Sequence, residues 1–578
     1  MTSKWIFTDL TDEQQKCQEN IAQKLSVDPI LAKLLVQRGI TSFEEARLFF
    51  RPTLTSLHDP FLMADMAKAV DRLNRAIGHK EKILIYGDYD VDGTTAVALV
   101  YKFLQRYTSN VAYYVPDRYT EGYGISMKGI DFAAEHGFQL VITLDCGIKA
   151  VEKVYYANSL GVDFIICDHH NPDEKLPNAV AVLDPKRLDC NYPYKHLSGC
   201  GVGFKLIQAF AISNDIPFSE LTPLLDLVAV SIASDIVPIT GENRTLMFFG
   251  LKQLNTFPSI GLQSIIDVSD LKGKEISVSD IVFKLGPRIN ASGRMRTATE
   301  VVDLLVSKDV DFAREKSDSI NELNNDRKDL DKNITEEAIF YIKNNINYET
   351  RKSIVVYNPD WHKGVVGIVA SRLSEEYYKP TVVLTSSNGL ATGSARSVPG
   401  FDLYAAIDSC RDLLDNFGGH LYAAGLSMKV ENVEEFSRRF EKYVSENILP
   451  EQLTPQTDID AIIDFNSITP KFMRILKQFA PFGPGNMKPI FVTKNTIDAG
   501  TSRLVGKEQE HLKLDLRDPL NSSVMGGIAF KMGHFFDTLK SKKPIDVCYT
   551  LEENFFAGNT TIQLMVREIQ KSEENSYV

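Results

Sequence analysis

The stretch KILIYGDYDVDG, residues 82–93, decides the fold. Its first six residues form an apolar run that is typical of a strand buried on both faces. Asp88, Asp90 and Asp92 follow at once, and a largely apolar helical pattern occupies residues 94–107. A strand, a cluster of acids and then a helix predict the first unit of a parallel α/β sheet. The acids then lie beyond the carboxyl end of the strand, where such sheets bind ligands.

The same arrangement recurs along the chain. Further strand-like runs occupy 139–145 and 163–168, and helical segments separate them, which predicts a doubly wound parallel sheet. The first of these runs ends in Asp145, and the second is followed by His169 and His170. Because the carboxyl ends of parallel strands meet at one edge of a sheet, we expect these side chains to converge with the earlier acids.

Such a cluster of acids and imidazoles predicts a metal site. Crowded carboxylates repel one another and are costly unless a cation neutralises them. Mixed carboxylate and imidazole ligands suit Mn²⁺ or Mg²⁺ better than Zn²⁺. Two such ions about 3.5–4 Å apart can activate water and hold phosphoryl oxygens, so the cluster predicts hydrolysis of a phosphoester or phosphoanhydride. A further acid near the apolar run at 228–239 is a candidate ligand, either Asp235 or Asp226.

Two segments partly match other known motifs. DYDVDG matches the start of an EF-hand loop, which requires a Glu at its twelfth position. Counted from Asp88 that position is Leu99, inside an apolar helix, so the EF-hand fails. Gly199, Gly201 and Gly203 form an alternating glycine run, but the spacing is not GxGxxG and a clear strand does not precede it. This argues against a nicotinamide-binding dehydrogenase.

The composition is that of a large globular protein. With 578 residues, of which 44% are hydrophobic, the chain is long enough for roughly three or four domains. The net charge of −12 argues mildly against nucleic acid, although a carboxylate metal site contributes negative charge of its own. Seven well-separated cysteines without a CxxC predict reduced thiols and a cytoplasmic location. We expect neither a membrane span nor a secretory signal.

Changes in pattern along the chain predict the domain organisation. The charged stretch after residue 300 lacks Gly and Pro and predicts a long helix that joins two lobes. Short alternating segments in the last quarter predict a small β-barrel. The expected parts are an N-terminal helical segment (1–75), a catalytic α/β domain (76–300), a connecting helix (301–350), a smaller α/β domain (351–450), a β-barrel (451–570) and a disordered tail (571–578).

Several motifs resemble those of a known superfamily. DYDVDG at 88–93, LDCG at 144–147 and DHHNPDEKLPNAVAVLDP at 168–185 are similar to successive motifs of the DHH phosphoesterases. That superfamily includes manganese-type inorganic pyrophosphatases, nanoRNases, cyclic-dinucleotide phosphodiesterases and RecJ nucleases. The resemblance implies a DHH domain at 76–300 and a DHH-associated domain at 351–450.

Further segments resemble the RecJ nucleases in particular. They are SGCGVGFKL (198–206), GPRINASGRM (286–295), WHKGVVGIVASRL (361–373), GSARSVPGFDL (393–403) with FGGHLYAAG (417–425), and FGPGNMKPIF (482–491). The last resembles the RecJ segment that leads into an oligonucleotide-binding (OB) barrel, which implies an OB fold at 451–570. An extra C-terminal domain of some longer relatives is not expected here.

The resemblance implies a function in DNA repair. RecJ proteins are exonucleases specific for single-stranded DNA that degrade it from 5′ to 3′ and serve in recombinational repair and mismatch repair. The expected enzyme therefore hydrolyses phosphodiesters with two divalent cations, Mn²⁺ or Mg²⁺, and releases mononucleotides. The expected partners are single-stranded DNA and, from the family, a single-strand-binding protein and a helicase, with no membrane.

The resemblance also assigns roles around the metals. Asp90 and Asp145 hold one ion, Asp88 supports it, and Asp145 bridges to the second ion. The catalytic group is His170, Asp145 and Asp92, with His170 facing the scissile phosphate. SIASDIV at 231–237 departs from the family's usual GTVADVV but keeps its Asp. The complete implied set of metal-binding residues is Asp88, Asp90, Asp92, Asp145, His169 and Asp235.

A second set of residues is implied in DNA binding. In the family a Ser-x-Arg pair grips the 5′-terminal phosphate, and Ser394 and Arg396 match it. An Arg fork and exposed backbone N–H groups are suited to phosphate oxygens. The remaining candidates for nucleic-acid contact are Arg118, Arg288, Arg294 and His420. The candidate aromatic side chains for base stacking are Tyr119, Tyr123 and Phe401.

Two other functions remain open from the sequence. The first is a DHH phosphodiesterase acting on short RNA or cyclic dinucleotides, which the predicted barrel disfavours. The second is an inactive DNA-binding or scaffold protein that keeps the fold. Such proteins lose metal ligands, whereas this chain retains the whole expected set, which favours an active enzyme.

Overall fold

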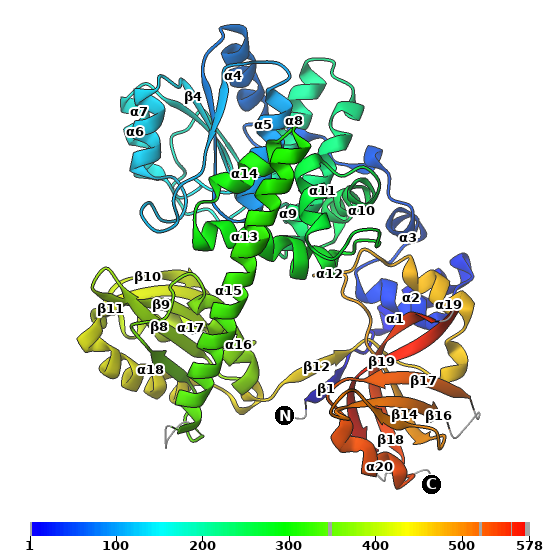
Figure 1. Cartoon of the computed structure of the whole chain (residues 1–578). Helices are drawn as coiled ribbons and strands as arrows, with labels where there is room; N and C mark the ends of the chain where they lie inside the picture. The colour runs from blue at the N-terminus through cyan, green and yellow to red at the C-terminus, as the bar shows by residue number, and fades with distance from the viewer. Residues whose placement is uncertain (1–2, 345–348, 519–522, 557, 573–578) are drawn as a thin grey trace. The chain divides into compact units, whose positions relative to one another are not determined.

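The protein folds into two compact units. The computed structural model describes residues 3–344, 349–518, 523–556 and 558–572. Of these described residues, the first unit contains Ser3 and those within 58–237 and 249–455, and the second contains those within 4–57, 238–248 and 456–572 (Figure 1). None of the helices in the described ranges combines the length and apolar character that a bilayer crossing requires.

A five-stranded parallel sheet forms the centre of the first unit. Its strand order is β3-β2-β4-β5-β6, and every neighbouring pair is parallel. β2 and β4 are adjacent although β3 lies between them in sequence, so the order reverses at this pair. The carboxyl ends of such a pair are the usual ligand site of an open α/β sheet. The strands are β2 (Ile83–Gly87), β3 (Val111–Tyr114), β4 (Leu140–Leu144), β5 (Asp163–Cys167) and β6 (Ala181–Leu183).

Helices cover both faces of this sheet, so the doubly wound fold predicted from the sequence is confirmed. One face packs against α5 and α8, with α9 behind them, and the other packs against α6 and α7 (Figure 1). β2 and β4 are buried at every residue, as expected for strands covered on both sides. These helices, with α4 beside α8, are α4 (Met66–Gly78), α5 (Val91–Leu104), α6 (Met127–Glu135), α7 (Val151–Ser159), α8 (Gly199–Ser213) and α9 (Leu225–Ser234).

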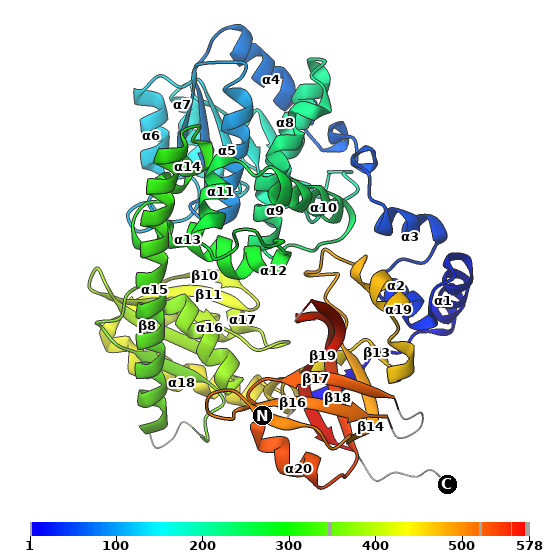
Figure 2. The ribbon, with the colours of Figure 1, turned by 45° about the vertical axis from the view of Figure 1, so that its right-hand side comes forward.

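The long helix predicted from the charged stretch is present as α15 (Val310–Asn344). It begins later than the expected residue 301, because Asp309 accepts hydrogen bonds from the N–H groups of Asp311 and Phe312 and starts a new helix there. α15 packs against α11, α13 and α14 at one end and α16 at the other (Figure 2). These helices are α11 (Ile260–Asp267), α13 (Gly286–Met295), α14 (Thr299–Val306) and α16 (Val366–Tyr377).

The smaller α/β domain of the first unit is a mixed sheet in the order β10-β11-β9-β8-β7. Only β7 and β8 are parallel, and the other pairs are antiparallel. α16 packs on β8 and β9, while α17 and α18 pack together. The elements are β7 (Ile354–Tyr357), β8 (Thr381–Ser387), β9 (Leu390–Arg396), α17 (Leu403–Asp408), β10 (Leu414–His420), β11 (Ala423–Lys429) and α18 (Val433–Asn447).

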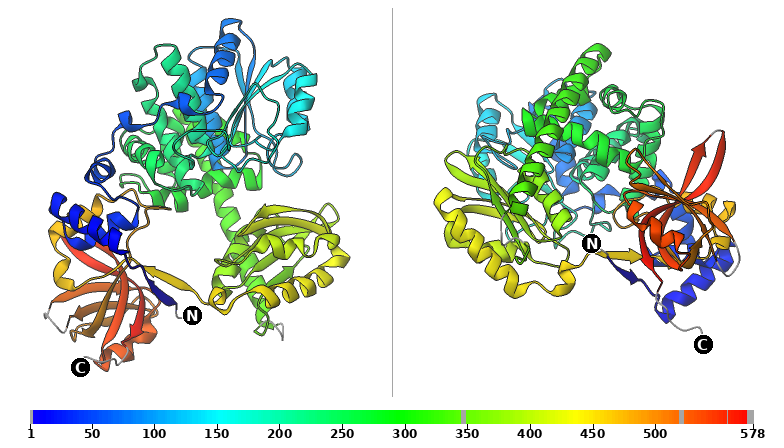
Figure 3. Two further views of the ribbon diagram at one scale, coloured as in Figure 1. Left: turned by 180° about the vertical axis from the view of Figure 1, so that it is seen from behind. Right: turned by 60° about the horizontal axis from the view of Figure 1, so that its bottom comes forward.

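The second unit contains the predicted OB-like β-barrel, seen from two further sides in Figure 3. Its order is β13-β14-β18-β19-β17-β16-β15, and an additional pairing of β14 with β16 closes the barrel. The elements are β13 (Ala461–Ile462), α19 (Pro470–Lys477), β14 (Phe491–Asp498), β15 (Arg503–Val505), β16 (His511–Arg517), β17 (Val524–Ala529), α20 (Phe536–Lys540), β18 (Ile545–Phe556) and β19 (Asn559–Lys571).

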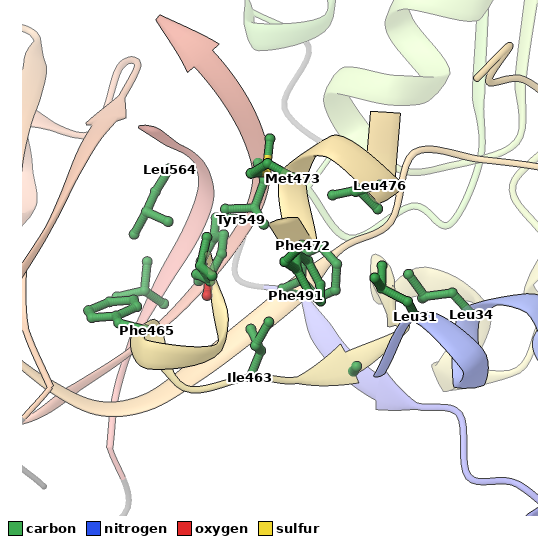
Figure 4. Close-up of a cluster of buried hydrophobic side chains, with 14 of the residues drawn as sticks. Leu31, Leu34, Ile463, Phe465, Phe472, Met473, Leu476, Phe491, Tyr549 and Leu564 are labelled. Carbon is green, nitrogen blue, oxygen red and sulfur yellow. The ribbon is translucent and has the colours of Figure 1, made fainter. Parts of the chain in front are cut away.

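Residues 4–57 belong with this barrel, whereas the sequence predicted one helical segment over residues 1–75. β1 pairs in parallel with β12. Leu31 and Leu34 of α2 share one buried cluster with Phe472 of α19 and Phe491 of β14 (Figure 4). The two amphipathic helices thus cover an apolar side of the barrel. The elements are β1 (Lys4–Phe7), α1 (Asp12–Leu25), α2 (Pro29–Gln37), α3 (Phe43–Phe50) and β12 (Gln456–Ile459). Most of the predicted disordered tail, residues 573–578, lies outside the described residues.

Candidate metal centre and phosphate site

The strand ends of the large sheet bring the predicted metal ligands together. Three groups of donor atoms each lie within 4.8 Å of one another. They overlap at Asp145 and at His169, so they form one continuous cluster. The groups are Asp88 with Asp90 and Asp145, Asp92 with His169 and Asp235, and Asp145 with His169 and His170.

His169 lies at the centre of the second group. Its Nε2 atom is 3.1 Å from Oδ1 of Asp145, 3.6 Å from Oδ2 of Asp235 and 3.8 Å from Oδ2 of Asp92. The imidazole reaches this point because β5 ends at Cys167 and the chain turns directly into the cluster. One nitrogen facing three carboxylates is the arrangement expected around a divalent cation.

The amino-terminal end of α8 fixes the orientation of Asp92. The N–H groups of Gly199 and Cys200 donate to its two carboxylate oxygens at 2.6 Å and 2.8 Å, and the Ser231 hydroxyl donates at 2.7 Å. A helix amino terminus favours a negative charge, so these donors hold the Asp92 carboxylate in place. The carboxylate is therefore held before any cation binds.

Asp145 occupies a strained position at the end of β4. Its φ is 60°, in the left-handed region that a non-glycine residue seldom adopts. Gly199 packs against it so closely that a Cβ atom at position 199 would lie 2.5 Å from the Asp145 Cβ. A glycine is therefore required at position 199 for the close approach of α8 to Asp145.

The donor atoms fit divalent cations because they are buried and lack other partners. Oδ1 of Asp88, Oδ1 of Asp145 and both ring nitrogens of His169 have no hydrogen bond within the described residues. Burial, followed by repulsion from Asp92 and Asp90, raises the pKa of Asp145 well above its ordinary value. Unpaired buried carboxylates of this kind are costly, and a cation removes the cost.

Asp235 belongs to the cluster, whereas Asp226 does not. Burial and the charges of Asp92 and Asp90 raise the pKa of Asp235 to about 8. Asp226 is buried elsewhere on α9, where its oxygens accept from the N–H groups of Leu227 and Ser259 at 2.7 Å each. The geometry therefore favours Asp235 as the metal-binding acid that the sequence left undecided.

His170 is oriented by the first residue of its own motif. Its Nδ1 lies 2.7 Å from Oδ1 of Asp168, which also accepts from the N–H groups of His169 and His170. Burial would raise the pKa of Asp168, but the hydrogen bond and charge of His170 outweigh it and lower that pKa to about 2. Asp168 is thus an ionised anchor for His170.

A second polar site lies on the sheet of the smaller α/β domain. Nη1 of Arg396 donates to the Ser394 hydroxyl at 2.6 Å, and its Nε donates to the Ser371 hydroxyl on α16 at 3.1 Å. Ala423 pairs with both His420 and Arg396, so all three lie in line across adjacent strands. Directly paired residues share one face of a sheet, so His420 lies on the face that carries Arg396.

Several arginines lie near Ser394 and Arg396. Arg294 donates from Nη1 to the carbonyl of Gly364 at 3.1 Å. Burial lowers the pKa of Arg294 to about 10, and repulsion from Arg118, Arg327 and Arg396 contributes further. Buried arginines that repel one another are stabilised by a bound anion, so this region is a candidate phosphate site.

Other predicted DNA contacts have structural roles. The Arg288 guanidinium donates to the carbonyls of Lys284 and Val268 and to the side chain of Asn321. The bond to Asn321 joins α13 to α15, the bond to Val268 joins α13 to the end of α11, and the residue is only 7% exposed, so its contact with DNA stays a prediction. Phe401 lies in the core of the smaller α/β domain. The Tyr119 hydroxyl donates to the Arg294 carbonyl, so its ring is tied to the protein.

Some residues of these sites were missed from the sequence. Ser231 and Cys200 support Asp92, Ser371 supports Arg396, and Arg327 adds charge near Arg294. Each acts across a tertiary contact. Cys200 and Ser371 lie in segments that resemble RecJ, but those segments alone do not indicate the contacts. Asp168 differs, since its position beside two histidines was the signal that could have identified it as their anchor.

A doubly wound sheet whose strand ends gather Asp and His side chains into one buried cluster defines a metal-dependent phosphoesterase of the DHH class. Family models agree with this assignment. Residues 82–232 match the DHH family N-terminal domain, residues 351–446 match the DHHA1 domain, and residues 459–568 match the RecJ OB domain.

Comparison with individual proteins identifies the family within this class. The single-stranded-DNA-specific exonuclease RecJ of Bacillus subtilis is 36% identical over 575 residues, which are 99% of this chain and 72% of that protein. The RecJ of Haemophilus influenzae is 32% identical, over 96% of this chain and 98% of that protein. The crystal structure of Thermus thermophilus RecJ with Mn²⁺ matches with a TM-score of 0.84 at 25% identity, over 99% of this chain and 80% of that one. The chain belongs to the RecJ family.

Proposed function

We propose that this protein is a metal-dependent exonuclease specific for single-stranded DNA that degrades its substrate from the 5′ end and releases mononucleotides. The observation that carries the proposal is the pairing of two sites in one unit. One is a cluster of buried acids and imidazoles around Asp145, and the other is a cationic region around Arg396. The RecJ relatives named as single-stranded-DNA-specific exonucleases support the same substrate.

The chemistry follows from the donor set. Asp90 and Asp145 are suited to one cation, and Asp92, Asp145, His169 and Asp235 to a second. When bound, two divalent cations of the Mn²⁺ or Mg²⁺ type activate water and neutralise phosphoryl oxygens. His170 is anchored at Nδ1 by Asp168 beside Asp145 and His169, where the family likeness implies that it faces the scissile phosphate. Asp88 adds a further carboxylate beside Asp90 and Asp145.

The polarity follows from the Ser-x-Arg pair. A 5′-terminal phosphate carries more charge than an internal one, and a planar guanidinium binds it with two parallel hydrogen bonds. Arg396 is held from two sides by Ser394 and Ser371, which fixes the plane of the guanidinium. Arg294, Arg118 and the exposed His420 extend the polar surface for the first nucleotides.

We further propose the cellular context that the family implies. The enzyme acts in recombinational repair and mismatch repair, where a helicase supplies single strands and a single-strand-binding protein covers them. The OB-like barrel supplies a second surface for single-stranded DNA. A cytoplasmic location is consistent with seven cysteines that are all free thiols.

Digestion of end-labelled oligonucleotides tests the proposal. Single strands and duplexes, each with and without a 5′ phosphate, are incubated with Mn²⁺, Mg²⁺ or chelator. We expect mononucleotides from the 5′ end of single strands only, and no products with chelator. Asp145→Ala removes the shared ligand and should abolish cleavage, while the unchanged far-ultraviolet circular dichroism controls for folding. Retention of near-normal cleavage by this variant would contradict the site.

The same assay separates the competing functions. A phosphodiesterase for short RNA or cyclic dinucleotides would hydrolyse those substrates faster than a long single strand. A scaffold protein would bind DNA but release nothing with either metal. Either result replaces the exonuclease proposal.

A further inference from the structure

Tyr123 makes contacts at the metal centre that its sequence position does not predict. It lies in the loop between β3 and α6, and the residue is 53% exposed. Its hydroxyl nevertheless lies 3.1 Å from Nε2 of His170, 3.3 Å from Nδ1 of the same ring and 3.3 Å from the carbonyl oxygen of Asp145. The hydroxyl is thus directed into the site, although one side of the residue faces solvent.

The hydrogen-bonding options of His170 decide the role of this hydroxyl. Nδ1 is 2.7 Å from the carboxylate of Asp168, and a carboxylate can only accept, so Nδ1 carries the proton. The Tyr123 hydroxyl, 3.1 Å from Nε2, can bond to it in either protonation state of the ring. It donates its one proton to a neutral Nε2, or it accepts from Nε2–H of the imidazolium while donating to the Asp145 carbonyl. The imidazole is therefore held at both nitrogens.

Aromatic packing holds Tyr123 in turn. Its ring makes edge contacts with Tyr89, at a centroid distance of 6.5 Å, and with His170, at 5.8 Å. The Tyr89 ring also contacts Arg118, whose guanidinium lies over it at 4.9 Å from the ring centre. Arg118, Tyr89, Tyr123 and His170 thus form a chain of contacts that leads to the metal centre.

From these contacts we propose that Tyr123 is a positioning residue for His170. A ring held only at Nδ1 by Asp168 can still swing about that hydrogen bond. The second hydrogen bond, with Tyr123, removes this freedom and orients the imidazole before DNA binds. Such preorganisation acts on the transition state because less reorientation is needed as the reaction proceeds. The inference rests on the proposed nuclease function and adds a residue to it.

Tyr123→Phe tests this role because it keeps the ring packing and removes only the hydroxyl. We expect kcat for a 5′-phosphorylated single strand in Mn²⁺ to fall about tenfold with KM unchanged, the pattern of an interaction that acts in the transition state. Tyr114→Phe is the matched control. It makes the same chemical change on β3, where the hydroxyl bonds to Glu121 at 2.9 Å, and it should leave kcat unchanged.

A double variant tests whether Tyr123 acts through His170. Single-turnover rates, with enzyme in excess, are measured for wild type, Tyr123→Phe, His170→Ala and the double variant. We expect the loss of the Tyr123 hydroxyl to lower the single-turnover rate about tenfold when His170 is present and less than twofold in the His170→Ala background. Equal losses in both backgrounds would overturn the proposal, as would an unchanged rate in Tyr123→Phe.

The outcomes also separate this inference from the function on which it rests. A wild-type enzyme that releases no nucleotide with Mn²⁺ would refute the nuclease and the role of Tyr123 together. A wild-type enzyme that cleaves normally, beside a Tyr123→Phe variant with equal kcat and KM, would refute the positioning role alone. Thermal unfolding of each variant should match wild type, because residue 123 is half exposed.

Discussion

Nε2 of His169 lies 3.1 Å from Oδ1 of Asp145, and neither atom makes a hydrogen bond within the described residues. If both groups were deprotonated, two lone pairs would face each other in a buried site. The contact is favourable only when a proton or a cation lies between them. Protons and metal ions must therefore compete for the same atoms.

The first prediction is that Mn²⁺ stabilises the protein more at pH 8 than at pH 6. The pKa of Asp145 is raised and that of Asp235 is raised to about 8, so the metal-free folded state holds protons that the unfolded chain releases. These groups therefore cost the metal-free protein stability as pH rises from about 4 to about 8, whereas metal affinity increases over that range. Thermal unfolding with Mn²⁺ or chelator at both pH values measures the difference.

Asp145→Asn is the control for this experiment. The amide does not titrate and is a poor metal ligand, so the stabilisation by Mn²⁺ should shrink and depend less on pH, with Asp235 as the remaining titrating group. Equal stabilisation of the wild type at pH 6 and pH 8 would show that protons do not compete with the metal at these carboxylates.

The second prediction separates Asp235 from Asp226. Asp235→Asn should lower Mn²⁺-dependent cleavage at least 100-fold while the metal-free protein becomes no less stable, because a repelled carboxylate is removed. Asp226→Asn should keep the activity of the folded protein but cost about 1–3 kcal/mol of stability, since an amide cannot accept both backbone hydrogen bonds. Cleavage rates and urea unfolding measure the two effects, and the reverse pattern would exchange the two roles.

The metal cluster could be predicted from the sequence because its geometry follows from local rules. An apolar strand predicts a buried parallel strand, and the residues after it lie at the carboxyl edge of the sheet. Asp90, Asp145 and His169 each follow such a strand, so their convergence required no knowledge of distant packing. Asp235 follows a helix instead, and the sequence could not choose between it and Asp226.

The contribution of α8 could not be predicted in the same way. In the sequence, Gly199 belongs to an alternating glycine run that fails as a dinucleotide motif and to a segment, 198–206, that resembles RecJ, and neither pattern indicates its contact with Asp145. Its requirement arises from the approach of α8 to Asp145, which joins residues more than 50 positions apart. No local pattern encodes such an approach.

The division of the N-terminal segment was hidden for a similar reason. Helical patterns from the start of the chain to residue 75 are alike in composition, so they were grouped together. Their partners differ, however. Leu31 packs with Phe491 of the barrel, whereas α4 packs with α8 of the first unit. Which core covers an amphipathic helix is a tertiary property, and periodicity alone does not give it.

The third prediction concerns the 5′ phosphate. Arg396→Lys keeps the charge but loses the planar fork, so the preference for a 5′-phosphorylated end over a hydroxyl end should fall about tenfold. Arg288→Lys is the matched control, because Arg288 bonds only to protein groups among the described residues. It should lower stability and leave the preference unchanged. The ratio of cleavage rates for the two substrates gives the result, and a preference lost in both variants would argue against a specific role for Arg396.

The fourth prediction concerns the glycines at the start of α8. A Cβ atom at position 199 would lie 2.5 Å from the Asp145 Cβ and 2.7 Å from its Cα, so Gly199→Ala must push the helix end away from Asp145. The same shift breaks the hydrogen bonds from the N–H groups of residues 199 and 200 to Asp92. We expect cleavage to fall at least 100-fold and the stabilisation by Mn²⁺ to shrink.

Gly201→Ala is the comparison for this variant, two residues farther along the same helix. Its new Cβ would approach Leu197 no closer than 3.4 Å, and alanine favours a helix over glycine by up to about 1 kcal/mol. This variant should therefore fold at least as stably as the wild type and cleave at a normal rate. If Gly199→Ala behaved in the same way, α8 could not be the element that holds Asp145 and Asp92 in place.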